Sequence, residues 1–195
     1  MKVFKRFSAD VEKILEQGGV GVIPTDTIYG IVGLALSRGA VSRIYRLRHR
    51  RPDKPMIILI GSLNDLESFG VKLDKETGKA VKKLWPGKVS ILLPCPLKKF
   101  SYLHRETEKL AFRLPAKSSL RRLLGITGPL VAPSANLEGK PPAKTIMEAK
   151  KYFGEGVDFY IDSGRLVSKP STLAKFNNGK IAILRQGTAR VRKRK

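Results

Sequence analysis

Residues 19–33, with the sequence GVGVIPTDTIYGIVG, constrain the fold more than any other stretch of the chain. Val20, Val22 and Ile23 predict a buried strand that ends at Pro24, because proline has no N–H to donate within a sheet. The polar residues 25–27 are typical of a helix N-cap, and the small and apolar residues 29–36 then predict a helix. A strand, a polar turn and a helix would bring hydroxyl and N–H groups to the carboxyl edge of a sheet, where α/β proteins commonly bind ligands. A capped turn without any ligand is an equally good interpretation of this stretch alone.

The net charge of the chain indicates which kind of molecule it binds. Its 195 residues suffice for one domain with a sizeable core, and 39 Lys and Arg against 16 Asp and Glu give a net charge of +23. Such a surface attracts polyanions, nucleic acid first, although part of the excess can be solvated surface with no specific partner. Cys95 is the single cysteine and His49 and His104 are the only histidines, which excludes a disulfide framework and disfavours a His/Cys metal site. Without an apolar run of about 20 residues or a signal-peptide core, we expect a soluble, cytoplasmic protein with no membrane partner.

Strand-like and helix-like segments alternate along the chain. The apolar spacing predicts helices over residues 10–17, 40–48, 64–69, 75–85, 118–124 and 145–153. It predicts strands over residues 56–60, 89–93, 109–113, 130–132, 157–161, 172–176 and 180–184, the last two joined by a hairpin turn at Asn177-Asn178-Gly179. Gly125 should end the helix at 118–124. The alternation and the terminal hairpin predict one α/β domain built on a mixed parallel and antiparallel sheet.

The polar residues that could carry chemistry stand at the predicted ends of helices and strands. They are cations, hydroxyls and an amide: Arg48, Arg50, Lys54, Arg113, Ser134, Asn136, Ser171 and Arg185. Such donors favour a ligand that carries phosphate. The sequence has no Walker-type loop, no GxGxxG motif and no Ser/His/Asp arrangement, and its few carboxylates give little support to a paired-carboxylate hydrolase. Taken singly, each residue has an ordinary explanation as a helix cap, a loop hydrogen bond or a solvated charge.

Seven short motifs between residues 24 and 187 resemble those of one family. They are PTDTIYG (24–30), LRHR with KP (47–55), WPG (85–87), AFRLP (111–115), PSANLEG (133–139), PST (170–172) and ILRQG (183–187). In this order they resemble the YrdC-like domain of the threonylcarbamoyl-adenylate synthases. One motif would be weak support, whereas seven in order identify the chain as a member of that family. The resemblance implies a single domain over residues 1–188, with a concave, basic face on a twisted mixed sheet, followed by a basic tail at residues 189–195.

The resemblance also implies a reaction. L-threonine, bicarbonate and ATP would form threonylcarbamoyl-AMP and pyrophosphate, with Mg²⁺ accompanying ATP. The product would serve the threonylcarbamoyladenosine modification in the anticodon loop of tRNA, and this short form would depend on separate proteins for the transfer to tRNA. In a nucleotidyl transfer the protein mainly positions the reactants and neutralises charge, which suits a site rich in arginine.

Site residues follow by resemblance, motif by motif. The threonine site would comprise Thr27, Arg113, Ala132 and Ser171, with Arg113 pairing with the carboxylate and Ala132 contributing backbone atoms only. The nucleotide would be bound by Arg50, Lys54, Ser134, Asn136 and Arg185, and the catalytic cations would be Arg48, Arg50 and Lys54. For Asp26, a helix cap is favoured over a contact with threonine. The chain departs from the family's usual residues at Arg48, Arg51, Leu59, Lys88, Lys109, Lys117 and Pro142.

The sequence leaves two other interpretations of the function beside the synthase. A non-catalytic module of the same fold could hold double-stranded RNA or tRNA on its basic face, and such binding would weaken steeply with salt. The related domain of hydrogenase-maturation carbamoyltransferases fits poorly, because those proteins are longer and carry zinc-finger cysteines that this chain lacks.

Overall fold

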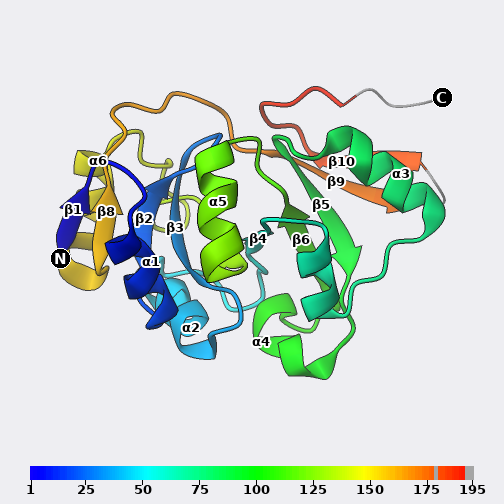
Figure 1. Cartoon of the computed structure of the whole chain (residues 1–195), viewed down its shortest axis with the longest axis horizontal. Helices are drawn as coiled ribbons and strands as arrows, with labels where there is room; N and C mark the ends of the chain where they lie inside the picture. The colour runs from blue at the N-terminus through cyan, green and yellow to red at the C-terminus, as the bar shows by residue number, and fades with distance from the viewer. Residues whose placement is uncertain (178–179, 192–195) are drawn as a thin grey trace.

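Ten strands form one mixed sheet in the computed structural model, which describes residues 1–177 and 180–191 (Figure 1). The strands are β1 (Lys2–Phe4), β2 (Gly21–Pro24), β3 (Tyr29–Leu34), β4 (Ile57–Leu59), β5 (Val89–Pro94), β6 (Lys109–Arg113), β7 (Leu130–Val131), β8 (Phe159–Ile161), β9 (Thr172–Asn177) and β10 (Lys180–Arg185). The α-helices are α1 (Ala9–Glu16), α2 (Arg38–Leu47), α3 (Lys75–Leu84), α4 (Ser101–His104), α5 (Ser118–Thr127) and α6 (Ile146–Phe153). Short 3₁₀ helices span Asn64–Phe69, Lys98–Phe100 and Gly154–Gly156.

Parallel and antiparallel pairs are mixed along the sheet, whose strand order is β1-β8-β2-β3-β7-β4-β6-β5-β9-β10. β8 is parallel to both β1 and β2, β4 is parallel to β6, and β5 is parallel to β9. The pairs β2–β3, β3–β7, β4–β7, β5–β6 and β9–β10 are antiparallel. The predicted α/β class with a mixed sheet and flanking helices is therefore confirmed.

Successive side chains of a strand point to opposite faces of the sheet, and this divides the core into two apolar layers. Val22 and Ile58 belong to the larger cluster, whereas their neighbours Ile23 and Leu59 belong to the smaller one. Helices α1 and α5 complete the smaller cluster with Val11, Leu15, Leu120, Leu123 and Leu124. In Figure 1, α5 stands across the middle of the sheet, so the strands behind it are buried on both faces.

Beyond α5, the same face of the sheet remains partly open. Ile57, Leu92, Ala111 and Leu173 point to this face, because they alternate along β4, β5, β6 and β9 with residues of the larger core cluster. These four side chains line a cavity instead of packing under a helix. We call them the apolar floor.

The segment after β2 is a strand, so the helix predicted over residues 29–36 is wrong. Residues 25–28 form a tight connection, and β3 returns antiparallel to β2. The β-branched pair Ile31-Val32 favours a strand, and the nearby glycines weaken a helix. A Cβ on Gly33 would lie 3.1 Å from the nearest side-chain atom of α2, so this glycine lets the helix pack closely on the strand.

The other predicted elements are confirmed, with a few differences. Strand β1 has no counterpart among the predictions, and residues 64–69 form a 3₁₀ helix. Helix α5 runs through Gly125 to Thr127, because the turn comes at Gly128, whose φ is 81°. β9 and β10 pair as predicted, while residues 178–179 of their turn and residues 192–195 of the predicted tail lie outside the described residues. Within the described part of the chain, no helix has the length and apolar character needed to cross a membrane.

Candidate functional site

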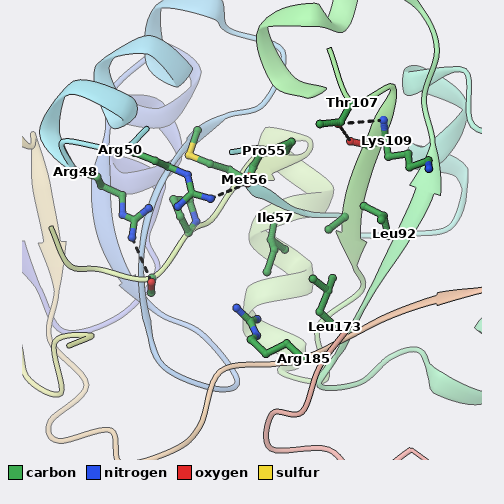
Figure 2. A pocket seen from close by; sticks show the side chains of 13 residues that line it. Arg48, Arg50, Pro55, Met56, Ile57, Leu92, Thr107, Lys109, Leu173 and Arg185 are labelled. Carbon is green, nitrogen blue, oxygen red and sulfur yellow. Dashed lines mark hydrogen bonds between the residues drawn. The ribbon is translucent and has the colours of Figure 1, made fainter. Parts of the chain in front are cut away.

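A cavity of about 360 Å³ opens over the apolar floor (Figure 2). Its lining residues are Arg48, Arg50, Pro55, Met56, Ile57, Leu92, Thr107, Lys109, Ala111, Pro133, Ser134, Leu173 and Arg185. Figure 2 shows Arg48 and Arg50 together on one side of the floor and Arg185 on another. An apolar floor with a basic rim suits a ligand that combines a flat apolar group with phosphates. We call this the large cavity, to distinguish it from the small cavity that adjoins it.

A smaller cavity of about 60 Å³ adjoins the large one and shares Ile57, Ser134 and Arg185 with it. Its other walls come from the turn between β2 and β3, the end of β6, the loop after β7 and the residues before β9. All four residues predicted for the threonine site lie here: Thr27, Arg113, Ala132 and Ser171. The fold therefore gathers them from four separate segments of the chain.

Arg113 ends β6 with its guanidinium almost fully buried. The side chains of Arg113 and Asp26 are each 4% exposed, and Nη2 of Arg113 lies 3.3 Å from Oδ1 of Asp26. Nη1 of Arg113 donates to Oγ1 of Thr27 at 3.2 Å. Burial lowers the pKa of Arg113, although the Asp26 carboxylate acts in the opposite direction. Nε of Arg113 is buried and has no hydrogen-bond partner among the described residues, so the guanidinium keeps one unused donor.

Side-chain hydrogen bonds hold the turn between β2 and β3. Oγ1 of Thr25 accepts from the N–H groups of Thr27 and Ile28 at 3.1 and 3.3 Å and donates to the carbonyl of Ile28 at 2.6 Å. Oδ2 of Asp26 accepts from the N–H of Ala116 at 3.0 Å. The predicted cap role of Asp26 is wrong, because a strand follows the turn. Its carboxylate instead faces the arginine at the end of β6.

Arg48 follows α2 and points inward, in contrast to the solvated helix end that its sequence neighbours favour. It is 3% exposed, and burial, then the charge of Arg50, lowers its pKa to about 10. Nε donates to the carbonyl of Asn136 at 3.0 Å, while Nη2 donates to Oδ1 of Asn136 at 3.1 Å and to Oγ of Ser134 at 3.4 Å. Asn136 lines neither cavity. Its hydrogen bonds with Arg48 instead hold the loop that contains Ser134. Nη1 of Arg48 is buried without a partner among the described residues.

Arg50 and Lys54 take different positions although they belong to one motif. Arg50 lines the large cavity and is held by two carbonyls, that of Lys54 at 3.0 Å from Nε and that of Pro55 at 2.8 Å from Nη2. Nζ of Lys54 instead pairs with Oε1 of Glu138 at 2.7 Å, and Lys54 lines neither cavity. The hydrogen bond from Lys54, with that from the N–H of Arg51, lowers the pKa of Glu138 to about 2. Lys54 would have to leave Glu138 to reach a ligand in the large cavity.

Ser171 is fixed from three sides. Its Oγ bonds to Oγ of Ser90 at 2.9 Å, and its carbonyl accepts from Nη2 of Arg185 at 3.0 Å. Behind it, a Cβ on Gly187 would overlap the carbonyl oxygen of Pro170, so only glycine allows the chain to pass this close. The segment after β10 therefore positions a wall of the small cavity.

The apolar floor and its neighbour Thr107 line the candidate site although the sequence patterns did not indicate them. The period-2 alternation of the strands was the available signal, but it does not tell which part of a face a helix leaves uncovered. Among the departures from the family's usual residues, Lys109 adds a cation to the lining of the large cavity. Leu59 lies beside Arg113 in the β4–β6 pair and is fully buried in the smaller core cluster.

No carboxylate lines either cavity, and the described residues include no cluster of three or more His, Cys, Asp or Glu side chains that could hold a metal. Cations and hydroxyls suit phosphate oxygens, whereas Mg²⁺ requires oxygen ligands, usually with a carboxylate among them. The residues present therefore do not form a protein site for Mg²⁺. An ion brought in by ATP would keep phosphate and water as its ligands.

Comparison with known proteins agrees with this geometry. The Sua5/YciO/YrdC family model, described as telomere recombination, matches residues 13–187. This chain belongs to the Sua5/YciO/YrdC family. A putative threonylcarbamoyl-AMP synthase of Methanocaldococcus jannaschii is 30% identical over 203 residues, covering 99% of this chain and 95% of the relative. The threonylcarbamoyl-AMP synthase of Hahella chejuensis is 31% identical over 176 residues, covering 89% of this chain and 94% of the relative.

A solved structure extends the similarity to three dimensions. The crystal structure of Pyrococcus abyssi Sua5 complexed with L-threonine is similar with a TM-score of 0.85 and 26% identity, covering 96% of this chain. This chain spans 58% of that longer protein. The family resemblance of the seven motifs is confirmed.

Proposed function

We propose that this protein is a threonylcarbamoyl-AMP synthase, a nucleotidyltransferase that forms threonylcarbamoyl-AMP and pyrophosphate from L-threonine, bicarbonate and ATP. The observation that carries the proposal is the pair of adjoining cavities. One holds a buried arginine with an unused donor, and the other has an apolar floor and a basic rim. Ser134 and Arg185 lie in both linings, so two ligands bound there would meet. Family members named for this synthase support the assignment.

The small cavity would bind threonine. Arg113 offers its guanidinium to the carboxylate, a planar contact that lysine could not reproduce. Oγ1 of Thr27 and Oγ of Ser171 can exchange hydrogen bonds with the amine or the hydroxyl of the substrate. Asp26 would keep Arg113 oriented and balance its charge before the substrate arrives.

The large cavity would bind ATP, with the base on the apolar floor and the phosphates along the cations. Arg50 and Arg185 line this cavity, and so does Arg48, whose buried Nη1 has no partner among the described residues. Such an arrangement would place the α-phosphate near Ser134, at the junction with the small cavity. Holding both reactants at that junction converts a bimolecular step into an effectively unimolecular one.

The chemistry needs little covalent work from the protein. The threonine amine attacks the carbon of bicarbonate and water leaves, which gives a carbamate. A carbamate oxygen then attacks the α-phosphorus of ATP, the bond from that phosphorus to the bridging oxygen breaks, and pyrophosphate leaves. Charge grows on the phosphate oxygens during this step, and fixed guanidinium groups stabilise it without reorganising. Mg²⁺ would enter with ATP and neutralise part of the phosphate charge.

Pyrophosphate release tests the proposal. Release should require ATP, bicarbonate and L-threonine together, and Arg113→Ala should lower kcat/KM for threonine by about 100-fold or more, because a charged contact is lost. Arg46→Ala is the matched control, since Arg46 is exposed on α2 and lines neither cavity. Release that is independent of threonine, or unchanged in Arg113→Ala, would contradict the assignment.

The net charge of +23 favours an RNA partner as well. We propose that structured RNA, with tRNA as the natural example, contacts the basic surface in the cytoplasm, and that separate proteins transfer the threonylcarbamoyl group. Retention of a tRNA on a filter should fall steeply between low and high salt and should survive Arg113→Ala. A protein that binds tRNA but releases no pyrophosphate would be the non-catalytic module instead.

A further inference from the structure

A third cavity, of about 380 Å³, is lined in part by Pro24, the residue before the β2–β3 turn. Its lining residues are Lys5, Arg6, Phe7, Glu12, Pro24, Lys117, Ser119, Arg122, Leu123, Ile161 and Ser163. It shares no lining residue with the large or the small cavity. Two of its walls are α1 and α5, which lie side by side in Figure 1.

Positive charge exceeds negative charge in this cavity. Of its four cations, Lys5 pairs with Asp162 at 2.7 Å. The side chains of Arg6, Lys117 and Arg122 form no ion pair and donate no hydrogen bond within the described residues. Glu12 is the one carboxylate of the lining. Bringing like charges together is unfavourable unless an anion joins them.

Lys117 is the least exposed of these cations. It is only partly exposed, and its Nζ lies 5.7 Å from the centre of the Phe7 ring. Burial lowers the pKa of Lys117, while the Asp26 carboxylate acts against this shift. A bound anion would recover the solvation that burial removes.

The cavity lies at the carboxyl ends of parallel strands, a position where α/β proteins commonly bind ligands. Strands β1, β8 and β2 are parallel neighbours, and the cavity lies where they end: at residues 5–7 after β1, at Pro24 of β2, and at Ile161 and Ser163 around the end of β8. Helix α5 begins beside the same space and has no acidic residue in its first turn.

We propose that this cavity binds a small phosphorylated anion, such as inorganic phosphate or pyrophosphate, independently of the nucleotide cavity. The guanidinium groups of Arg6 and Arg122 and the ammonium group of Lys117 match the oxygens of a phosphoryl group, and the hydroxyls of Ser119 and Ser163 can add hydrogen bonds. Two helices and three strand ends contribute its walls. The proposal does not depend on the synthase assignment.

Resolved amide NMR signals of the full chain test the proposal, because phosphates can also enter the large cavity. Titration with inorganic phosphate or pyrophosphate should shift the amides of Ser119 and Ser163, and saturation of those shifts gives the local affinity. The double variant Arg6→Ala with Arg122→Ala should weaken this local affinity at least tenfold and leave shifts near Ser134 unchanged. Arg185→Ala should weaken the binding seen near Ser134 and leave the affinity at Ser119 and Ser163 unchanged. Arg46→Ala should change the binding at neither place.

The variants remove exposed side chains, so an otherwise unchanged spectrum will show that they fold. Absence of shifts at Ser119 and Ser163 with both anions would overturn the proposal. So would shifts that persist at the same affinity in the double variant. A short RNA duplex is the second ligand: shifts produced by the duplex but by neither small anion would also overturn it, and would indicate docking of a nucleic-acid backbone.

Discussion

Arg113 and Asp26 face each other as buried charges beside the small cavity, and neither position is explained by packing alone. Each side chain is 4% exposed, and the ion pair spans 3.3 Å. Removing one member of such a pair leaves the other charge buried without compensation. We therefore interpret Asp26 as a positioning residue, which holds the arginine for a carboxylate ligand without touching the reacting atoms.

Asp26→Asn should raise the KM for L-threonine about tenfold, because the guanidinium loses its charged partner while the shape of the turn is kept. The KM for ATP should change much less. Steady-state pyrophosphate release, with each substrate varied in turn, separates the two constants. Glu76→Gln, which removes an exposed pair with Lys79 on α3, serves as the control and should leave both constants unchanged. Equal effects of Asp26→Asn on both constants would indicate a general structural role instead.

Arg48→Ala should destabilise the fold by about 2 kcal/mol, because buried acceptors on Asn136 and Ser134 lose their donor. Urea unfolding followed by circular dichroism measures this free energy. The control Arg46→Ala changes an exposed arginine of the neighbouring helix and should stay within about 0.5 kcal/mol of the parent protein. Equal stability of the two variants would contradict the bracing role of Arg48.

Among the elements, the β2–β3 hairpin shows where reading of the sequence fails. Thr25, Asp26 and Thr27 are chemically suited to cap a helix, but here they close a turn between two strands. The local sequence does not tell whether a helix or a strand follows the turn, because the pairing of β2 with β3 stabilises the strand. The β-branched residues Ile31 and Val32, which pair with Val22 and Gly21 across the turn, were the signal for a hairpin.

Gly187→Ala should raise the KM for threonine by about an order of magnitude, because the added Cβ would push the Pro170–Ser171 segment away from the small cavity. Pyrophosphate release at varied threonine concentration measures the effect. Gly125→Ala is the control: nothing lies within 4 Å of its added Cβ, and alanine favours the helix there. A Gly187→Ala variant with normal threonine kinetics would show that this wall is not part of the site.

At the scale of the whole molecule, sequence patterns predicted the class of fold but not how far each helix extends over the sheet. Alternating apolar segments were sufficient for the α/β class, and the motif residues around Arg113 and Ser171 were found by their order along the chain. The apolar floor was not predictable, since it exists only where α5 leaves one face of the sheet uncovered. The same long-range arrangement turned Lys54 and Asn136 away from the cavities, to Glu138 and Arg48.

Asp158 links distant parts of the molecule and gives its stability a pH dependence. It accepts from Nη1 of Arg43 at 2.6 Å and from the N–H of Val20 at 2.7 Å. Burial raises its pKa, but these hydrogen bonds, together with the charges of Arg43 and the N-terminus, outweigh burial and the pKa is lowered. A carboxyl whose folded pKa is below its unfolded value stabilises the fold above the unfolded pKa, and this contribution disappears as the pH falls through the folded pKa.

Asp158→Asn should therefore cost about 1 kcal/mol at neutral pH, a value reduced for partial exposure of the pair, and almost nothing near pH 2. Urea unfolding of the variant and the parent protein across this pH range measures the difference. Asp53→Asn, which alters a more exposed pair with Arg51, should show a smaller difference at every pH. A cost for Asp158→Asn that is independent of pH would contradict the charge argument.

The measurement that tests the central claim most directly is identification of the product by mass spectrometry. The protein would be incubated with ATP, Mg²⁺, L-threonine and ¹³C-bicarbonate, and the mixture analysed at short times. The two-cavity account predicts threonylcarbamoyl-AMP that carries one ¹³C atom and appears together with an equal amount of pyrophosphate. AMP or ADP without a labelled adenylate, under conditions where added threonylcarbamoyl-AMP survives, would contradict the account.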